Sequence, residues 1–152
     1  MAILDDHMKA LVRDHTLGFL ASVDADGTPN LSPKGTFAVL DDEHIGFGEM
    51  RSPTTLANIA RQPVVELNFV DVFRRKGFRF KGPAEFVANN DVRFQNLLES
   101  FANWQNLHDM FGGIVSVRVE RALEITSPAY DRGADEADLV ARFKDHFNSL
   151  YP

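Results

Sequence analysis

The chain has 152 residues, of which 44% are hydrophobic, and its 22 acidic side chains exceed its 16 basic ones, which gives a formal net charge of −6. This length predicts a single folded domain over residues 1–152, and the acidic balance argues against non-specific binding of nucleic acid or of an anionic membrane surface. Because cysteine is absent, disulfides, a thiol nucleophile and a thiolate metal site are excluded.

The hydrophobic spacing near the N-terminus predicts a helix that leads into two antiparallel hairpins. We expect the helix over residues 3–15. Leu4, Met8 and Leu11 recur there on one face, as in an amphipathic helix. Polar turns separate the strands that follow, and Gly27 in the first turn suits a positive φ angle. The expected strands are residues 17–23, 29–40 and 45–48.

The second half of the chain alternates short helices with further strands. Ser52 is a favourable N-cap, Pro53 suits the first helical position, and Pro63 cannot continue the helix. The strand expected at residues 78–87 carries a kink or bulge at residues 82–83. The other expected elements are a strand at 64–70, a helix from Asn90 or Asp91 to about Trp104, a long strand at 114–125 and a helix at 134–150.

Together these elements amount to about six strands and four helices. Hairpins that follow one another through short connections favour an antiparallel barrel with peripheral helices over a parallel βαβ sheet. We therefore expect a mainly β (α+β) fold built on a six-stranded antiparallel barrel. The 13 phenylalanines indicate either a tightly filled β core or a subunit interface.

Several function classes lack their sequence signatures. Residues 46–51 miss the third glycine of a dinucleotide fingerprint, and no βαβ unit surrounds them. There is no Gly-x-Ser-x-Gly elbow, and the five histidines lie too far apart to suggest a metal site. No apolar run is long enough to span a bilayer, and the N-terminus lacks the features of a signal peptide. We therefore expect a cytoplasmic protein without a metal or a membrane partner.

Residues 51–55 form the first candidate site, because a helix N-terminus offers unpaired N–H groups and a partial positive charge. Ser52, Thr54 and Thr55 would add hydroxyl groups, and Arg51 would add a guanidinium. The alternative is an ordinary capped helix with Arg51 on the surface. This segment alone favours that alternative.

Residues 32–36 form the second candidate site. Gly35 would let a ligand approach the backbone closely. Lys34 would contact an anionic oxygen or stabilise negative charge on a reduced ring. The alternative is a bulged strand with an exposed lysine, and this segment alone favours it.

The only basic cluster lies at residues 74–76 and is followed by Arg79 and Lys81. Its possible ligands are a phosphate, an anionic substrate or, with neighbouring phenylalanines as stacking surfaces, single-stranded nucleic acid. The alternative is a solvated hairpin loop. We prefer that loop to nucleic-acid binding, because the domain is acidic and its phenylalanines alternate as core residues do.

Taken together, these segments resemble the pyridoxamine 5′-phosphate oxidase-like family of FMN-binding split barrels. The resemblance runs from the first helix to about Val87, and it depends on the order and spacing of the motifs rather than on any one of them. The matching segments are residues 18–23, 26–29, 31–35, 45–47, 55–59, 62–64 and 82–85, with Phe69. The resemblance implies a six-stranded split barrel, usually a homodimer with FMN sites at its interface.

The resemblance also implies which residues hold the cofactor. The strand at residues 32–36 would line the isoalloxazine ring, while the strand end at 47–50 and the helix start at 51–55 would approach the ribityl phosphate. The implied cofactor-binding residues are Ser32, Pro33, Lys34, Gly35, Thr36, Phe47, Gly48, Glu49, Met50, Arg51, Ser52, Thr54 and Thr55. The candidate anion site and the implied phosphate site coincide, which reverses the preference for an ordinary cap. No residue is required as a covalent catalyst.

Three departures from the family pattern argue against true pyridoxamine phosphate oxidation. Thr54 and Thr55 stand where related oxidases carry a basic pair, Gly77 stands near the position of a polar glutamine, and an Arg-Leu-His-type substrate motif is absent. Arg51, Lys34 and the 74–76 loop are the candidate replacements for the missing phosphate contacts. We expect an FMN-dependent oxidoreductase-like protein that acts on another small substrate.

Two alternatives remain open. The missing basic pair is compatible with a deazaflavin-dependent reductase. The chain would otherwise be a non-catalytic module that holds flavin, haem or another small ligand.

Overall fold

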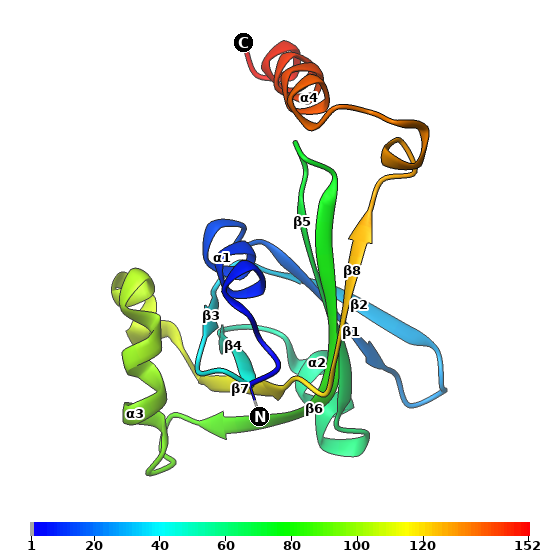
Figure 1. Cartoon of the computed structure of the whole chain (residues 1–152). Helices are drawn as coiled ribbons and strands as arrows, with labels where there is room; N and C mark the ends of the chain where they lie inside the picture. Colours follow the sequence, from blue (N-terminus) through cyan, green and yellow to red (C-terminus); the bar gives the residue numbers. More distant parts are fainter. Residues whose placement is uncertain (1) are drawn as a thin grey trace.

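An antiparallel sheet of eight strands forms the centre of the computed structural model, which describes residues 2–152 (Figure 1). The strands are β1 (Gly18–Val23), β2 (Pro29–Lys34), β3 (Phe37–Val39), β4 (His44–Glu49), β5 (Val64–Asp71), β6 (Lys76–Ala88), β7 (Gly113–Arg118) and β8 (Arg121–Thr126). The helices are α1 (Asp6–Asp14), α2 (Pro53–Arg61), α3 (Phe94–Leu98) and α4 (Glu136–Leu150), with 3₁₀ segments η1 (Glu99–Met110) and η2 (Tyr130–Arg132).

The sheet curls because its longest strand, β6, changes partners halfway along. The strand order is β2-β1-β5-β6-β7-β4-β3, and β8 also pairs with β6. The first half of β6 pairs with β8, from Lys76 opposite Thr126, while its second half pairs with β7, from Ala84 opposite Val117. All these pairs are antiparallel. The expected antiparallel split barrel within an α+β fold is therefore confirmed.

The number of strands was predicted wrongly as six, because two expected strands are each divided. The expected strand at 29–40 stops at Lys34 and resumes at Phe37. The expected strand at 114–125 breaks at residues 119–120, where the Val119 N–H donates to Glu43 and the Glu120 N–H donates to Lys81. The backbone thus leaves one set of partners for another, which the local pattern of alternation does not reveal.

Gly82 lies at the point where β6 exchanges its partners. A Cβ atom at this position would lie 1.8 Å from the carbonyl oxygen of Arg118. Gly82→Ala is therefore expected to lower the free energy of unfolding by about 2 kcal/mol, since the backbone must move to make room. Urea denaturation followed by circular dichroism measures this loss.

Gly112→Ala is the matched control for that substitution. Its Cβ atom would lie 3.8 Å from the nearest atom, the carbonyl oxygen of Glu49, which is an ordinary contact. An equal loss of stability in both variants would contradict the steric explanation.

Phenylalanines fill the interior of the barrel. The side chains with under 2% exposure include Phe37, Phe47, Phe69, Phe80 and Phe101. The first four belong to one core cluster, which α1 covers, and Phe101 belongs to a second cluster beneath α3 and η1. For these residues the core explanation is confirmed over the interface explanation.

The helix expected at residues 90–104 begins later and is mostly not α-helical. Only Phe94–Leu98 is α-helix, and the 3₁₀ segment that follows departs from helical angles at Phe101 and Trp104. Phe101 is completely buried, and the Trp104 indole N–H donates to the Phe37 carbonyl at 3.3 Å. These contacts with the core and with β3 outweigh the local preference of this segment for a regular α-helix.

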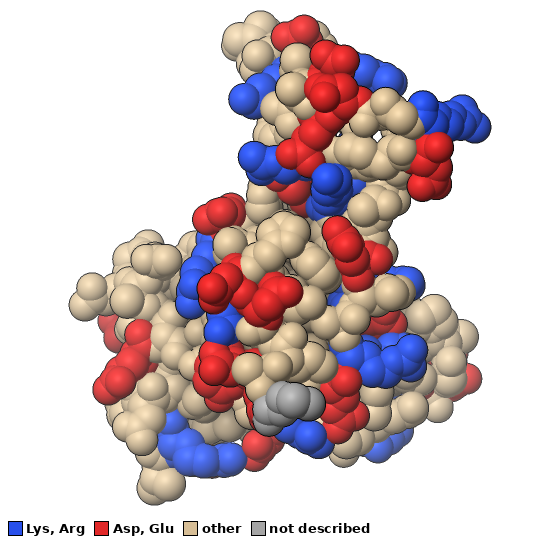
Figure 2. Space-filling model, viewed as in Figure 1, with Lys and Arg blue, Asp and Glu red and all other residues tan. Residues whose placement is uncertain are grey.

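The C-terminal helix forms close to the expected range but stands apart from the barrel. Figure 1 shows α4 beyond the tips of β5 and β6, and Figure 2 shows it as a separate lobe above the body. Of the expected apolar face, Leu139 is buried, whereas Phe143 and Phe147 are half-buried. The helix is attached through the turn between β5 and β6, where the rings of Phe147 and Phe73 lie 5.6 Å apart.

Candidate functional site

The two segments expected to hold the cofactor meet at the ends of β2 and β4. The Thr36 hydroxyl donates to the Gly48 carbonyl at 2.9 Å, and the Gly48 N–H donates to the Thr36 carbonyl at 3.2 Å. Gly48 must lack a side chain, because a Cβ atom would lie 2.1 Å from the ring of Phe111. Gly35 has open space around it. The backbone between β2 and β3 is therefore accessible to a ligand.

Lys34 is the last residue of β2 and lies near a core phenylalanine. Its ammonium group lies 5.4 Å from the centroid of the Phe47 ring. Burial lowers the pKa of the Lys34 ammonium below its ordinary value, and the negative charge of Glu49 opposes this shift. Lys34 is half-buried rather than exposed, so the alternative of a fully exposed lysine is wrong.

Glu49 places a carboxylate directly before helix α2. Its side chain belongs to a residue with only 5% exposure, and one of its oxygens accepts a hydrogen bond from the Ser52 hydroxyl. Helix α2 begins at Pro53 with Ser52 in the N-cap position, as expected. The Ser52 side chain makes no capping bond, however, because its hydroxyl is directed to Glu49 instead.

The other expected cofactor residues divide between the surface and the interior. Met50, Arg51, Thr54 and Pro33 are exposed, and Ser32 is half-buried. Thr55 is only 1% exposed. The structure therefore joins Lys34, Thr36, Gly48, Glu49 and Ser52 into one cluster, which we call the β4–α2 cluster. Around it lies a rim of exposed side chains.

The basic residues 74–76 are not a free hairpin loop, because the C-terminal segment engages all three. Arg74 pairs with Asp71 at 2.7 Å and with Glu136 at 3.3 Å, and Lys76 pairs with Glu136 at 2.8 Å. The Arg75 guanidinium lies 3.7 Å from the centroid of the Phe143 ring. The hydrogen bond from Lys76 lowers the pKa of Glu136, and the charge of Arg74 adds to this effect.

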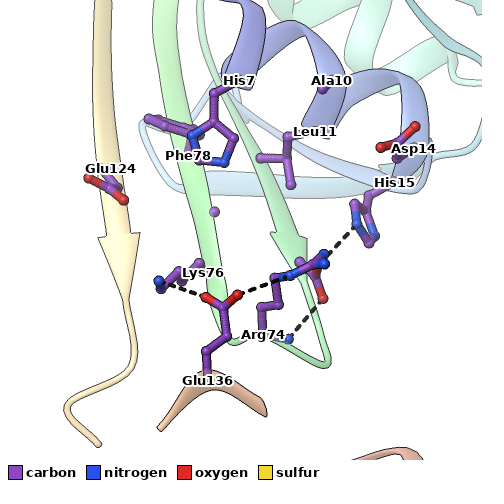
Figure 3. Close-up of a pocket in the computed structure, with 12 residues that line it drawn as sticks. His7, Ala10, Leu11, Asp14, His15, Arg74, Lys76, Phe78, Glu124 and Glu136 are labelled. Atoms are coloured by element: carbon purple, nitrogen blue, oxygen red, sulfur yellow. Dashed lines mark hydrogen bonds and ion pairs between the residues drawn. The ribbon is translucent and has the colours of Figure 1, made fainter. Parts of the chain in front are cut away.

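A cavity of about 310 Å³ lies between α1, the β5–β6 hairpin, β8 and the start of α4 (Figure 3). Its wall includes His7 and Leu11 from α1, His15 directly after that helix, and Arg74, Lys76 and Phe78 from the hairpin. Glu124 and Glu136 complete the rim. None of the thirteen expected cofactor residues lines it, but Arg74 and Lys76 of the expected basic cluster do. The cavity itself was not predicted from the sequence.

Asp71 organises the base of this cavity. Its carboxylate accepts the backbone N–H groups of Phe73 and Arg74, each at 2.9 Å, and lies 3.4 Å from His15 Nε2. Burial alone would raise the pKa of Asp71, but the backbone and guanidinium N–H groups of Arg74, with the Phe73 N–H, outweigh it and lower the pKa. The available sequence signal was an aspartate at a strand end, directly before a basic turn.

Two further searches concern the described residues 2–152. No group of three or more histidine, aspartate or glutamate side chains among them converges as metal ligands do. None of the helices in this range combines the length and the apolarity needed to cross a bilayer. On the face seen in Figure 2, acidic and basic side chains are interspersed.

Comparison with known proteins bears on the part of the chain that contains the β4–α2 cluster. The family model described as pyridoxamine 5′-phosphate oxidase matches residues 4–125, which leaves out η2 and α4. HupZ of Group A Streptococcus is 29% identical over 82% of this chain and 96% of that chain, with a TM-score of 0.70. A search of curated proteins found no match.

Two other solved structures share the architecture. A candidate pyridoxamine 5′-phosphate oxidase of Lactobacillus delbrueckii is 27% identical over 81% of this chain and 95% of that chain, with a TM-score of 0.67. An FMN-binding protein of Syntrophomonas wolfei is 15% identical over 79% of this chain and 84% of that chain, with a TM-score of 0.61. At that identity the second likeness concerns the fold alone.

Proposed function

The chain belongs to the pyridoxamine 5′-phosphate oxidase family, and from this premise we propose that it binds FMN and acts as a flavin-dependent oxidoreductase on a small substrate. The observation that best supports this proposal is the pair of hydrogen bonds between Thr36 and Gly48, because it joins the two segments that the family pattern assigns to one cofactor. The Syntrophomonas neighbour, named as an FMN-binding protein, indicates only that a protein of this fold can bind FMN.

The polar residues of the two segments suit a flavin, because some lie where the ring would bind and others lie where the phosphate would bind. Gly35 and Thr36 would offer backbone groups to the ring, and the Lys34 ammonium would stabilise negative charge that develops there. Arg51 and Thr54 are exposed beside the first turn of α2, where they would contact the phosphate. The bound flavin would supply the electron transfer, while these side chains bind and orient it.

True pyridoxamine phosphate oxidation is not the reaction that we propose. The start of α2 carries Thr54 and Thr55 in place of a basic pair. The basic cluster at 74–76 does not replace that pair as a free anion site, because Asp71 and Glu136 together form ion pairs with Arg74 and Lys76. A substrate without a second strongly anionic group agrees better with this arrangement.

We also propose that the protein is a cytoplasmic homodimer with a cofactor site at the interface. The outer face of β1 and β2 carries Phe19, 40% exposed, and Leu31, 66% exposed. Phe19 lies opposite Pro33, and Leu31 lies opposite Ala21, so these apolar residues share one face of the sheet. Contiguous exposed apolar surface of this kind is typical of an interface.

The test of cofactor binding is direct. The purified protein is expected to show flavin absorption, and added FMN is expected to raise its melting temperature. A ligand at a hundred times its Kd stabilises the native state by about 2.7 kcal/mol. A colourless protein whose melting temperature does not respond to FMN would rule the proposal out.

A deazaflavin-dependent reductase is the second candidate function, and the lack of a basic pair at Thr54 and Thr55 favours it. The same titration with a deazaflavin cofactor separates the two, since the true cofactor is the one that binds more tightly. Steady-state assays with a reduced nicotinamide and an electron acceptor then establish whether the loaded protein turns over.

A further inference from the structure

Two places in the structure carry side chains that could bind a phosphate, the β4–α2 cluster and the β5–β6 turn. In each place, a glutamate of the chain itself already interacts with those side chains. In the β4–α2 cluster, Glu49 accepts a hydrogen bond from the Ser52 hydroxyl. In the β5–β6 turn, Glu136 forms ion pairs with Arg74 and Lys76. Each carboxylate occupies donors that an incoming phosphate would need.

We propose that Glu49 competes with the cofactor phosphate for the Ser52 hydroxyl, and thereby sets how strongly the protein prefers FMN over riboflavin. This inference rests on the proposed function, because it concerns the same flavin site. It goes further by naming the residue that tunes phosphate recognition, and it also assigns the phosphate to α2 rather than to the 74–76 turn.

The hydroxyl of Ser52 shows the competition most simply. A serine hydroxyl has a single proton to donate, and here Glu49 receives it. A phosphate at the start of α2 could therefore accept a hydrogen bond from Ser52 only if the bond to Glu49 were broken. It also meets the negative charge of a residue that is only 5% exposed, so that solvent screens the repulsion poorly.

Lys34, which we assign to the flavin ring, is influenced by the same carboxylate. Burial lowers the pKa of the Lys34 ammonium, and the negative charge of Glu49 opposes this shift. FMN and riboflavin carry the same ring, so the difference between their affinities reports on the phosphate and not on the contact of Lys34 with the ring.

Glu136 provides the comparison within the same chain. It also bridges two potential phosphate ligands, but its side chain is 43% exposed, and its partner Arg74 is 57% exposed. Solvent therefore screens these pairs more strongly than it screens Glu49. The two glutamates can be neutralised separately, which distinguishes a phosphate at α2 from a phosphate at the β5–β6 turn.

The experiment compares the native protein with Glu49→Gln, Glu136→Gln and Glu124→Gln, each titrated with FMN and with riboflavin. Glutamine keeps the shape of glutamate but removes its charge, so it accepts a weaker hydrogen bond from the Ser52 hydroxyl than the carboxylate does. We expect Glu49→Gln to bind FMN about tenfold more tightly, a modest effect for one charge at partly buried positions. Riboflavin affinity is expected to stay within about threefold of the native value, since no phosphate repulsion is relieved.

Glu136→Gln and Glu124→Gln are the controls, and both are expected to leave the two affinities within about threefold of native. Tighter FMN binding by Glu136→Gln would overturn the inference by assigning the phosphate to residues 74–76. Equal tightening of FMN and riboflavin by Glu49→Gln would also overturn it, because the effect would then not involve the phosphate.

A measurement on the native protein covers the case in which Glu49→Gln does not fold. We expect native FMN and riboflavin affinities to differ by less than about tenfold, since Glu49 opposes the phosphate. A native preference for FMN of about a thousandfold or more would contradict the inference while leaving the proposed function intact. Failure of every variant to bind either flavin would instead overturn the proposed function, and this inference with it.

Discussion

Phe69→Ala is expected to lower the free energy of unfolding by about 4 kcal/mol, which is typical of a completely buried phenylalanine. Phe69 has 0% exposure, and its ring lies 4.7 Å from that of Phe37 and 6.2 Å from that of Phe80. The packing is tight, because even a Cβ atom on Gly18 would approach the Phe69 ring to 2.6 Å. The neighbours cannot easily collapse into the space that the missing ring would leave.

Urea denaturation at several protein concentrations measures this loss, with Phe19→Ala as the matched control. Phe19 lies on the outer face of the same sheet and is 40% exposed. Its removal is expected to cost less than about 1 kcal/mol within one subunit, with a further loss that depends on protein concentration if this face joins two subunits. A loss below about 1 kcal/mol for Phe69→Ala would contradict its role in the core.

The local pattern of the sequence was enough to predict which faces are buried. Val65, Leu67 and Phe69 alternate along β5, and all three are 2% exposed or less. Leu11 lies on the buried face of α1, as its spacing indicated, whereas Leu4 is buried but precedes the helix, which begins at Asp6 and not at residue 3. Alternation and helical spacing are short-range properties, so they can be read without knowing what packs against them.

The partners of each strand could not be predicted in the same way. The break near Gly35 and the break at residues 119–120 occur where the backbone changes hydrogen-bonding partners. Those partners lie far away in the sequence, as the bond from Glu120 to Lys81 illustrates. Alternation continues through the break at residues 119–120, and no strong turn signal marks the break near Gly35, so one strand was predicted at each place where two exist.

In the candidate site, too, local features were predicted from the sequence, whereas the partners of the side chains were not. The N-cap position of Ser52 and the helix start at Pro53 were predicted correctly from local preferences. The hydroxyl's actual partner, Glu49, depends on how β4 enters the helix, and local preferences do not specify it. The charge of residues 74–76 was visible in the sequence. The ion pairs of this cluster with Glu136 were not predicted, because they form only when α4 packs against the β5–β6 turn, about sixty residues earlier in the chain.

Asp71→Ala is expected to lower the free energy of unfolding by about 3 kcal/mol near neutral pH, because hydrogen bonds to an ionised carboxylate contribute more than neutral ones. The substitution removes the acceptor for the Phe73 and Arg74 N–H groups in the β5–β6 turn and for the Arg74 guanidinium. That turn also carries the contacts of α4. Weaker protection of α4 in hydrogen exchange is therefore expected as well.

The dependence of this loss on pH identifies its cause. The folded-state pKa of Asp71 lies below its ordinary value of 3.8, so the ionised carboxylate stabilises the fold above that value and ceases to do so as the pH falls through the folded pKa. The stability difference between the native protein and Asp71→Ala should thus stay constant from about pH 7 to about pH 5 and narrow from there to about pH 3 and below. Asp109→Ala, at an exposed position, should show little loss at either pH. A difference for Asp71→Ala that stayed constant on acidification would mean that packing, and not the charge of Asp71, holds the turn.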